Sequence, residues 1–220
     1  MWQEMIDLQS IALLETLYMV AISGALACLI GIPLGVLLTV TSKGHLLSCP
    51  PFYRIMGMIV NAARSIPFII LMVAIIPLTR LLAGTSIGTE AAIVPLTLAA
   101  APFVARVIEN ALKEVDSGMI EAAQSMGANP WQIIWNVLLP ESLPGMLAGL
   151  TLMFISLIGY SAMAGAIGGG GLGDLAIRYG YQRFRPDVML VTVIILIILV
   201  QGCQSLGDWV VNGIYRRRGK

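Results

Sequence analysis

The residue types that most often do chemistry are few and widely separated in this chain. Its one histidine is His45, and its three cysteines share no CxxC or Cys/His cluster: they are Cys28, Cys49 and Cys203. Such spacing favours neither a metal site nor a disulfide framework. Ser161 has no candidate general base, and the sequence contains neither paired carboxylates nor a G-x-x-x-x-G-K-[ST] loop. The sequence therefore predicts no catalytic residues, no bound metal and no cofactor held by the chain itself.

A polar stretch with regular spacing lies at residues 121–140 and reads EAAQSMGANPWQIIWNVLLP. Its landmarks are Glu121, Ala122, Ala123, Gly127 and Pro140. A short helix that exposes apolar groups beside a membrane fits a groove on a partner protein. The alternative is an amphipathic helix that lies on the membrane surface. Periodicity alone favours the membrane-surface helix. The spacing of Glu-Ala-Ala, glycine and Leu-Pro reverses this preference through the family resemblance described below.

Two short helices are predicted within this stretch. The Asn-Pro pair at 129–130 is a helix-start signal, because asparagine caps a helix and proline is tolerated at the first helical position. Gly127 suits the C-terminal stop of the preceding helix. We therefore expect helices at 118–127 and 130–138, with a bend between them and with Pro140 ending the second.

Around this stretch the chain is strongly apolar. Of its 220 residues, 58% are hydrophobic and 11% are charged, which is about half the charged fraction of soluble domains. Runs of about 20 apolar residues cross a bilayer as helices and are too long for barrel strands. Five such runs lie at roughly 17–40, 58–82, 88–112, 143–167 and 188–211. The sequence predicts an all-α polytopic membrane protein with a single transmembrane domain over residues 1–220. A net charge of only +1 argues against nucleic acid as a partner.

The positions of lysine and arginine predict how the chain is oriented. Five spans place the termini on opposite sides, and a cytoplasmic C-terminus puts nine of these residues inside and four outside. The inner residues are Lys43, Arg54, Arg64, Arg106, Lys113, Arg216, Arg217, Arg218 and Lys220. The outer residues are Arg80, Arg178, Arg183 and Arg185. Arg64 and Arg106 count as internal because each lies near the predicted cytoplasmic end of its span. This excess of lysine and arginine on the inner side favours an external N-terminus and a cytoplasmic 113–142 loop.

The 121–140 stretch resembles the cytoplasmic Glu-Ala-Ala loop of permease subunits in binding-protein-dependent ABC importers. Val137 stands where that family usually has isoleucine, which keeps the apolar character. Three further segments are similar to the permeases of methionine ABC importers and extend the resemblance well beyond the loop. They read NAARSIPFIILMVAIIP at 61–77, GTSIGTEAAIVPLTLAAAPFVARVIENAL at 84–112 and GYSAMAGAIGGGGLG at 159–173.

The resemblance implies a bacterial inner-membrane permease that is a translocation subunit, not an enzyme, and that works as a homodimer. Its expected partners are two cytoplasmic ATPase subunits that use ATP and magnesium, a lipid-anchored methionine-binding protein outside, and membrane lipid. The expected cargo is D- and L-methionine, with another small amino acid or related solute as the alternative. The residues expected to couple the permease to the ATPase are Glu121, Ala122, Ala123, Gly127 and Pro140.

A run of small residues near the end of the fourth predicted span indicates where the translocation path lies. It reads GYSAMAG over 159–165. Small residues let two helices approach closely. Met163 is unbranched and adaptable, so it can narrow an apolar path and move aside for a passing side chain. We expect Tyr160 and Ser161 to lie nearby. The alternative is that Met163 only fills a gap in helix packing.

Three other functions remain as alternatives. An ion-coupled secondary transporter needs ionisable residues near the membrane midplane, whereas Glu90 and Glu109 lie near the ends of predicted spans. An intramembrane enzyme needs a catalytic set that the sequence does not contain. A structural subunit without a pore of its own ranks low, because a dimer of five-helix units can enclose a pathway.

Overall fold

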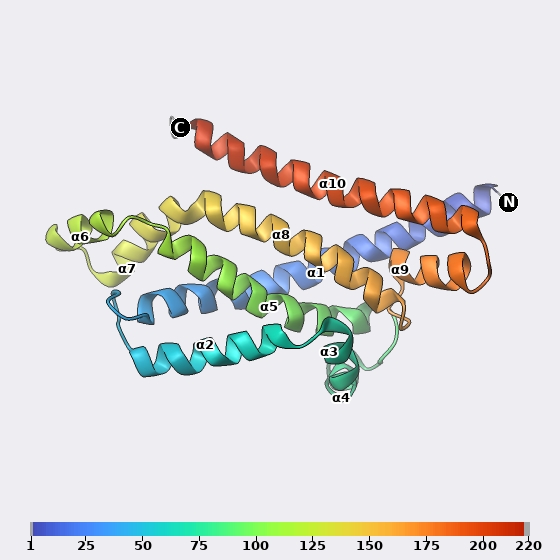
Figure 1. Cartoon of the computed structure of the whole chain (residues 1–220), viewed down its shortest axis with the longest axis horizontal. Helices are drawn as coiled ribbons and strands as arrows, with labels where there is room; N and C mark the ends of the chain where they lie inside the picture. The colour runs from blue at the N-terminus through green and yellow to red at the C-terminus, as the bar shows by residue number, and fades with distance from the viewer. Residues whose placement is uncertain (1, 218–220) are drawn as a thin grey trace.

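The computed structural model describes residues 2–217. Over this range the chain is helical without strands, and four helices are long and apolar enough to cross a membrane. The bent pair α2 and α3 makes a fifth span if it is counted as one. The predicted all-α membrane fold is thus confirmed (Figure 1).

The helices are α1 (Trp2–Thr41), α2 (Pro50–Ser65), α3 (Phe68–Ala74), α4 (Ile76–Ala83), α5 (Thr89–Lys113), α6 (Ser117–Ser125), α7 (Pro130–Ile133), η1 (Ile134–Leu138), α8 (Leu139–Gly165), α9 (Gly171–Leu175), η2 (Ala176–Tyr181) and α10 (Pro186–Arg217).

The centre of the bundle is the contact between α1 and α5. Gly31 and Gly35 lie about one turn apart on α1, and both face α5 at very short range. A Cβ at Gly31 would lie 2.7 Å from the carbonyl oxygen of Ala101, and one at Gly35 would lie 2.6 Å from that of Ala105. Two glycines at this spacing let membrane helices pack backbone to backbone. The close contact therefore depends on glycine at both positions.

The second predicted span, 58–82, is not one helix, so that expectation was wrong. α2 starts at Pro50, ends at Ser65 and turns by 99° into α3. Ile66 has an extended ψ of 123°, because a residue that precedes a proline is pushed out of the helical region, and Pro67 follows it. The chain therefore changes direction within the bundle rather than running straight across it.

This bend changes the place of Arg64. Arg64 lies in the last turn of α2, about 21 Å along the helix from Pro50 at roughly 1.5 Å per residue. The expectation that it lies at the cytoplasmic end of its span was therefore wrong. Without Arg64, the predicted inner side still carries more lysine and arginine than the outer side. Arg218 and Lys220, which were also counted inside, lie outside the described residues.

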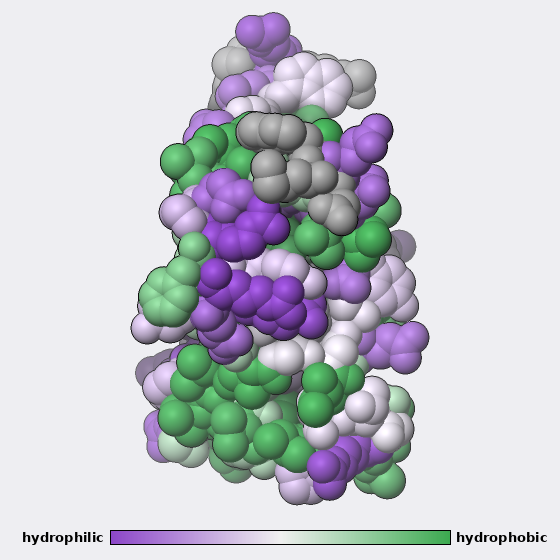
Figure 2. Space-filling view, turned by 90° about the vertical axis from the view of Figure 1, so that its right-hand side faces the viewer, coloured by the Kyte–Doolittle hydropathy of each residue, from purple (hydrophilic) through white to green (hydrophobic). Residues whose placement is uncertain are grey.

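α9 and η2 lie at the end of the bundle near the N-terminus, opposite the end that carries the C-terminus (Figure 1). Glu15 and Thr16 of α1 accept hydrogen bonds from the backbone N–H groups of Gly171, at 2.7 Å, and Leu172, at 2.9 Å. These contacts satisfy donors at the start of α9 and hold the glycine-rich 168–171 segment against α1. Figure 2 views this end face, where hydrophilic side chains gather across the middle between apolar ones.

Candidate functional site

α6 and α7 project from the end of the bundle next to the C-terminus (Figure 1). The Asp116 carboxylate caps α6 by accepting a hydrogen bond from the N–H two residues further on, at 2.8 Å. At the other end, Gly127 has a φ of +82°. Its N–H donates to the carbonyl of Gln124, and the N–H of Ala128 donates to that of Ala123. This pair of bonds is a Schellman motif, and the predicted helix stop at Gly127 is confirmed.

α7 starts at the predicted Asn-Pro pair. The Asn129 side chain accepts a hydrogen bond from the N–H of Gln132, and the Gln132 side chain accepts one from the N–H of Asn129, each at 2.9 Å. Pro130 occupies the first helical position. The reciprocal bonds form a capping box. Because both helix ends are fixed by local side chains, the bend between α6 and α7 is set by the sequence of the loop itself.

The prediction that Pro140 ends the second helix of the loop was wrong. α7 continues through the π-helical segment η1 into α8. The N–H of Leu139 donates to the carbonyl of Ile134, five residues back, and this widened turn accommodates a proline that has no N–H to donate. A second proline, Pro144, lies inside α8. The loop is therefore continuous with a membrane-spanning helix.

The Glu-Ala-Ala sequence divides between the surface and the core. Glu121 and Ala122 are exposed, whereas Ala123 is buried and belongs to the same core cluster as Ile133. Beyond them, Met126 is 83% exposed and Trp131 is 70% exposed. Large apolar side chains at an exposed tip are typical of a surface that binds another protein. The loop thus has an inner face that packs on the core of the protomer and an outer face that is accessible to a partner protein.

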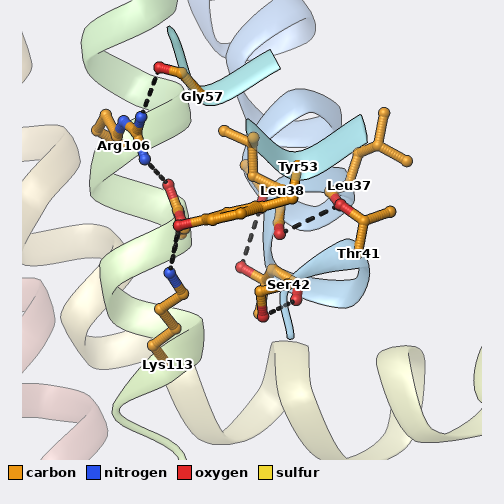
Figure 3. Close-up of polar contacts among 11 residues, drawn as sticks. Leu37, Leu38, Thr41, Ser42, Tyr53, Gly57, Arg106 and Lys113 are labelled. Carbon is orange, nitrogen blue, oxygen red and sulfur yellow. Dashed lines mark hydrogen bonds and ion pairs between the residues drawn. The ribbon is translucent and has the colours of Figure 1, made fainter. Parts of the chain in front are cut away.

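A buried ion-pair network joins α2 to α5 near the point where α5 leads into the loop (Figure 3). Glu109 is 1% exposed. Its carboxylate accepts hydrogen bonds from Lys113 at 2.6 Å, from the Tyr53 hydroxyl at 2.9 Å and from Arg106. Arg106 also donates to the carbonyl of Gly57 at 2.8 Å. A buried carboxylate is tolerated only when it is paired in this way. Since Tyr53 and Gly57 belong to α2, the network fixes α2 against α5.

His45 lies beside this network, in the loop between α1 and α2. Burial lowers the pKa of the His45 imidazole, and the positive charge of Lys113 lowers that pKa further. A histidine whose pKa is lowered by folding contributes stability that is present above its ordinary pKa of about 6.5 and is lost as the pH falls. The neutral imidazole is therefore the form that this loop accommodates.

One face of α8 carries Met163, one of the three residues predicted to line the path. Met163 is 47% exposed, and a Cβ built at Gly159 would meet no atom within 4 Å. Leu152, which is 54% exposed, continues the same stripe two turns before Gly159. Ile167, which is 46% exposed, lies just beyond the end of α8. The stripe of small and apolar residues is thus an open face of the protomer.

Tyr160 and Ser161 differ in their surroundings. The Tyr160 ring stacks on Phe68 of α3, with ring centroids 4.8 Å apart and an interplanar angle of 11°. Ser161 is 2% exposed, and its hydroxyl donates to the carbonyl of Ile158 at 2.8 Å. The structure therefore brings Tyr160 close to the open face that holds Met163 and leaves Ser161 inside the protomer.

Comparison with known proteins identifies the family to which the chain belongs. Residues 31–220 match the family described as "Binding-protein-dependent transport system inner membrane component". The chain belongs to this permease family.

The permease is 58% identical over 211 residues to the "Probable D-methionine transport system permease protein MetI" of Vibrio cholerae, with 96% of this chain and 94% of the relative covered. It is 50% identical to the protein of the same description from Pasteurella multocida, with 92% and 93% covered. Among solved structures, the native crystal form titled "Inward facing conformations of the MetNI methionine ABC transporter" has a TM-score of 0.95 and 50% identity, with 97% of this chain and 99% of that chain covered. The resemblance to methionine permeases is thus confirmed.

The ion-pair network of the permease was missed from the sequence although part of it carries a signal. Arg106 and Lys113 stand three residues before and four residues after Glu109, the spacing at which helix side chains meet. Tyr53 is 56 residues away from Glu109, and no local pattern relates the two. Only the folded chain shows that the cluster links two helices.

Proposed function

We propose that the chain is the membrane-spanning permease of an ATP-driven importer of D- and L-methionine. The observation that carries this proposal is the match of the whole protomer, projecting loop included, to the methionine transporter structure at a TM-score of 0.95. Two copies of the chain enclose the path, and each loop contacts a cytoplasmic ATPase that uses ATP and magnesium. A methionine-binding lipoprotein delivers the cargo from outside.

In this proposal the loop residues have different roles. Glu121 and Ala122, which are exposed, contact the ATPase. Ala123 and Gly127 shape the bend, since the first packs inward and the second has a positive φ. Pro140 stands where the loop passes into α8, so movement of the ATPase is transmitted to the fourth span.

Uptake measurements test the function directly. The chain, its ATPase and its binding protein are expressed in bacteria that lack their own methionine transport. Accumulation of labelled D- and L-methionine is expected, and it should stop when the ATPase is inactivated. Uptake that persists without ATP hydrolysis and follows an ion gradient would show a secondary transporter instead.

The proposed orientation places the N-terminus outside and the loop in the cytoplasm. Gln124 is exposed on α6. A cysteine at this position, in a background without native cysteines, is expected to react with a membrane-impermeant maleimide only after the cells are permeabilised. Gln182, exposed at the other end of the bundle, is the matched control and should react in intact cells. Labelling of position 124 from outside intact cells would show that the chain has the opposite orientation.

The proposed path runs along the open face of α8, where Met163 and its symmetry mate narrow it, with Tyr160 and Ser161 nearby. Cysteines at 160, 162 and 163 are then expected to cross-link between protomers, whereas one at the buried position 161 should not. Met163→Ala should raise basal ATPase activity because the constriction is lost. Thr151 faces α10, since a Cβ at Gly207 would lie 2.2 Å from its hydroxyl, and a cysteine there should not cross-link. If none of the positions 160, 162 and 163 cross-links in an assembled transporter, the path lies elsewhere.

A further inference from the structure

A small pocket lies at the bend between α2 and α3. It has a volume of about 200 Å³ and is lined by residues of α2, α3, α5 and α8, among them Arg64, Phe68, Ala99, Phe103 and Tyr160. Pockets for drug-sized ligands hold about 300 Å³ or more. The pocket is thus of the size that suits one small molecule, and it combines a single cation with three aromatic rings.

Arg64 is the charged member of this pocket. Its guanidinium lies 5.6 Å from the centroid of the Phe103 ring. Within residues 2–217 no carboxylate forms an ion pair with it, whereas Arg106 and Lys113 both pair with Glu109. Arg64 is exposed on the protomer, so its guanidinium is accessible to a ligand that enters the pocket. A guanidinium without an ion-pair partner suits an anionic group.

The aromatic residues form the apolar part of the pocket. Phe68 and Tyr160 stack on each other, and Phe103 lies under the arginine. Tyr160 stands one helical turn from Met163, which lies on the open face of α8. The pocket thus adjoins the proposed path rather than an unrelated surface.

We propose that this pocket is a transient binding station for the transported amino acid. The α-carboxylate pairs with the Arg64 guanidinium, which suits carboxylates because it donates two parallel hydrogen bonds. The apolar side chain lies against Phe103 and Tyr160, and a thioether gains favourable contacts with aromatic rings. The proposal rests on the proposed function in one respect: the chain must carry small apolar amino acids past α8.

Protection of a pocket cysteine from modification tests the station. Ala99→Cys is placed in the cysteine-free permease, assembled with its ATPase in lipid nanodiscs, and the rate of modification by a methanethiosulfonate reagent is measured. Saturating L-methionine is expected to slow this rate. Methioninol, which has an alcohol in place of the carboxylate, should not. Leu98→Cys is the matched control, because Leu98 is 38% exposed on the same helix but does not line the pocket.

Arg64 variants in the Ala99→Cys background assign the protection to the pocket and not to methionine bound elsewhere in the complex. Arg64→Gln is expected to raise the methionine concentration needed for half-protection about tenfold or more, since a charge-assisted hydrogen bond is lost. Arg64→Lys keeps the charge without the bidentate geometry and should retain part of the protection.

Several results would overturn the station. The first two are that methioninol slows modification as much as methionine does, and that methionine still protects the Arg64→Gln variant. The third is that methionine slows modification of Leu98→Cys equally. The fourth is that it protects neither Ala99→Cys nor a second pocket variant, Ala63→Cys. If uptake of methionine is normal while the pocket cysteines are unprotected, the station is wrong and the transport function stands. If uptake itself fails, the proposed function is wrong whatever the pocket does.

Discussion

Replacing Gly127 with valine is expected to abolish methionine uptake while the permease remains inserted in the membrane. Gly127 has a φ of +82°, and a Cβ there would meet no atom within 4 Å. The cost is therefore one of backbone conformation, about 1–2 kcal/mol for an ordinary residue and more for a β-branched one. Relaxation of this strain breaks the Schellman bonds that end α6. The angle between α6 and α7 then changes, and the loop no longer fits its ATPase.

The measurements are uptake, permease abundance in the membrane and copurification of the ATPase. Gly44→Val is the matched control, because Gly44 has the same φ of +82° and the same open space but lies in the loop between α1 and α2. Gly127→Asn should restore part of the uptake, since asparagine tolerates this conformation. Unchanged uptake and unchanged ATPase association in both Gly127→Val and Glu121→Lys would refute the coupling role of the loop.

The features that the sequence predicted correctly are those encoded over a few residues. The glycine stop at Gly127 and the Asn-Pro start after it depend on backbone geometry and on capping bonds that span four residues. Long apolar runs predict spanning helices because the bilayer allows few other structures. The role of Met163 in the translocation path, which was inferred from the small residues around it, stays a prediction.

The features that the sequence did not predict depend on contacts between distant segments or on proline in an unusual setting. Pro67 breaks its span, while Pro140 is accommodated by a π-helical turn, and composition alone does not separate the two cases. Arg64 was placed by counting residues from the edge of an apolar run, and the bend in the second span moved it. Its neighbour Phe103 is on another helix, so the pocket is not visible before folding. The same holds for the bond from Tyr53 of α2 to Glu109 of α5.

Replacing Glu109 with alanine is expected to give the largest loss of stability among single substitutions near the loop. Glu109 is 1% exposed, and it accepts hydrogen bonds from Arg106, Lys113 and Tyr53. Removal of one partner from a buried ion pair costs about 3–5 kcal/mol. We expect a value near 3 kcal/mol, because Lys113 is 39% exposed and can be rehydrated. The measurement is the unfolding midpoint of the purified permease–ATPase complex.

Two further variants separate the network from a general effect of lost charge. Tyr53→Phe removes one hydrogen bond and should cost about 1 kcal/mol. Glu114→Gln changes an exposed carboxylate on the next turn and should leave the midpoint within about 0.5 kcal/mol of wild type. Because α5 leads through residues 114–116 into α6, loss of the tie to α2 should also lower uptake at temperatures where Glu109→Ala is still folded. If Glu109→Ala unfolds at the wild-type midpoint, the network does not hold α2 against α5, and movement of the loop reaches the bundle through α8 alone.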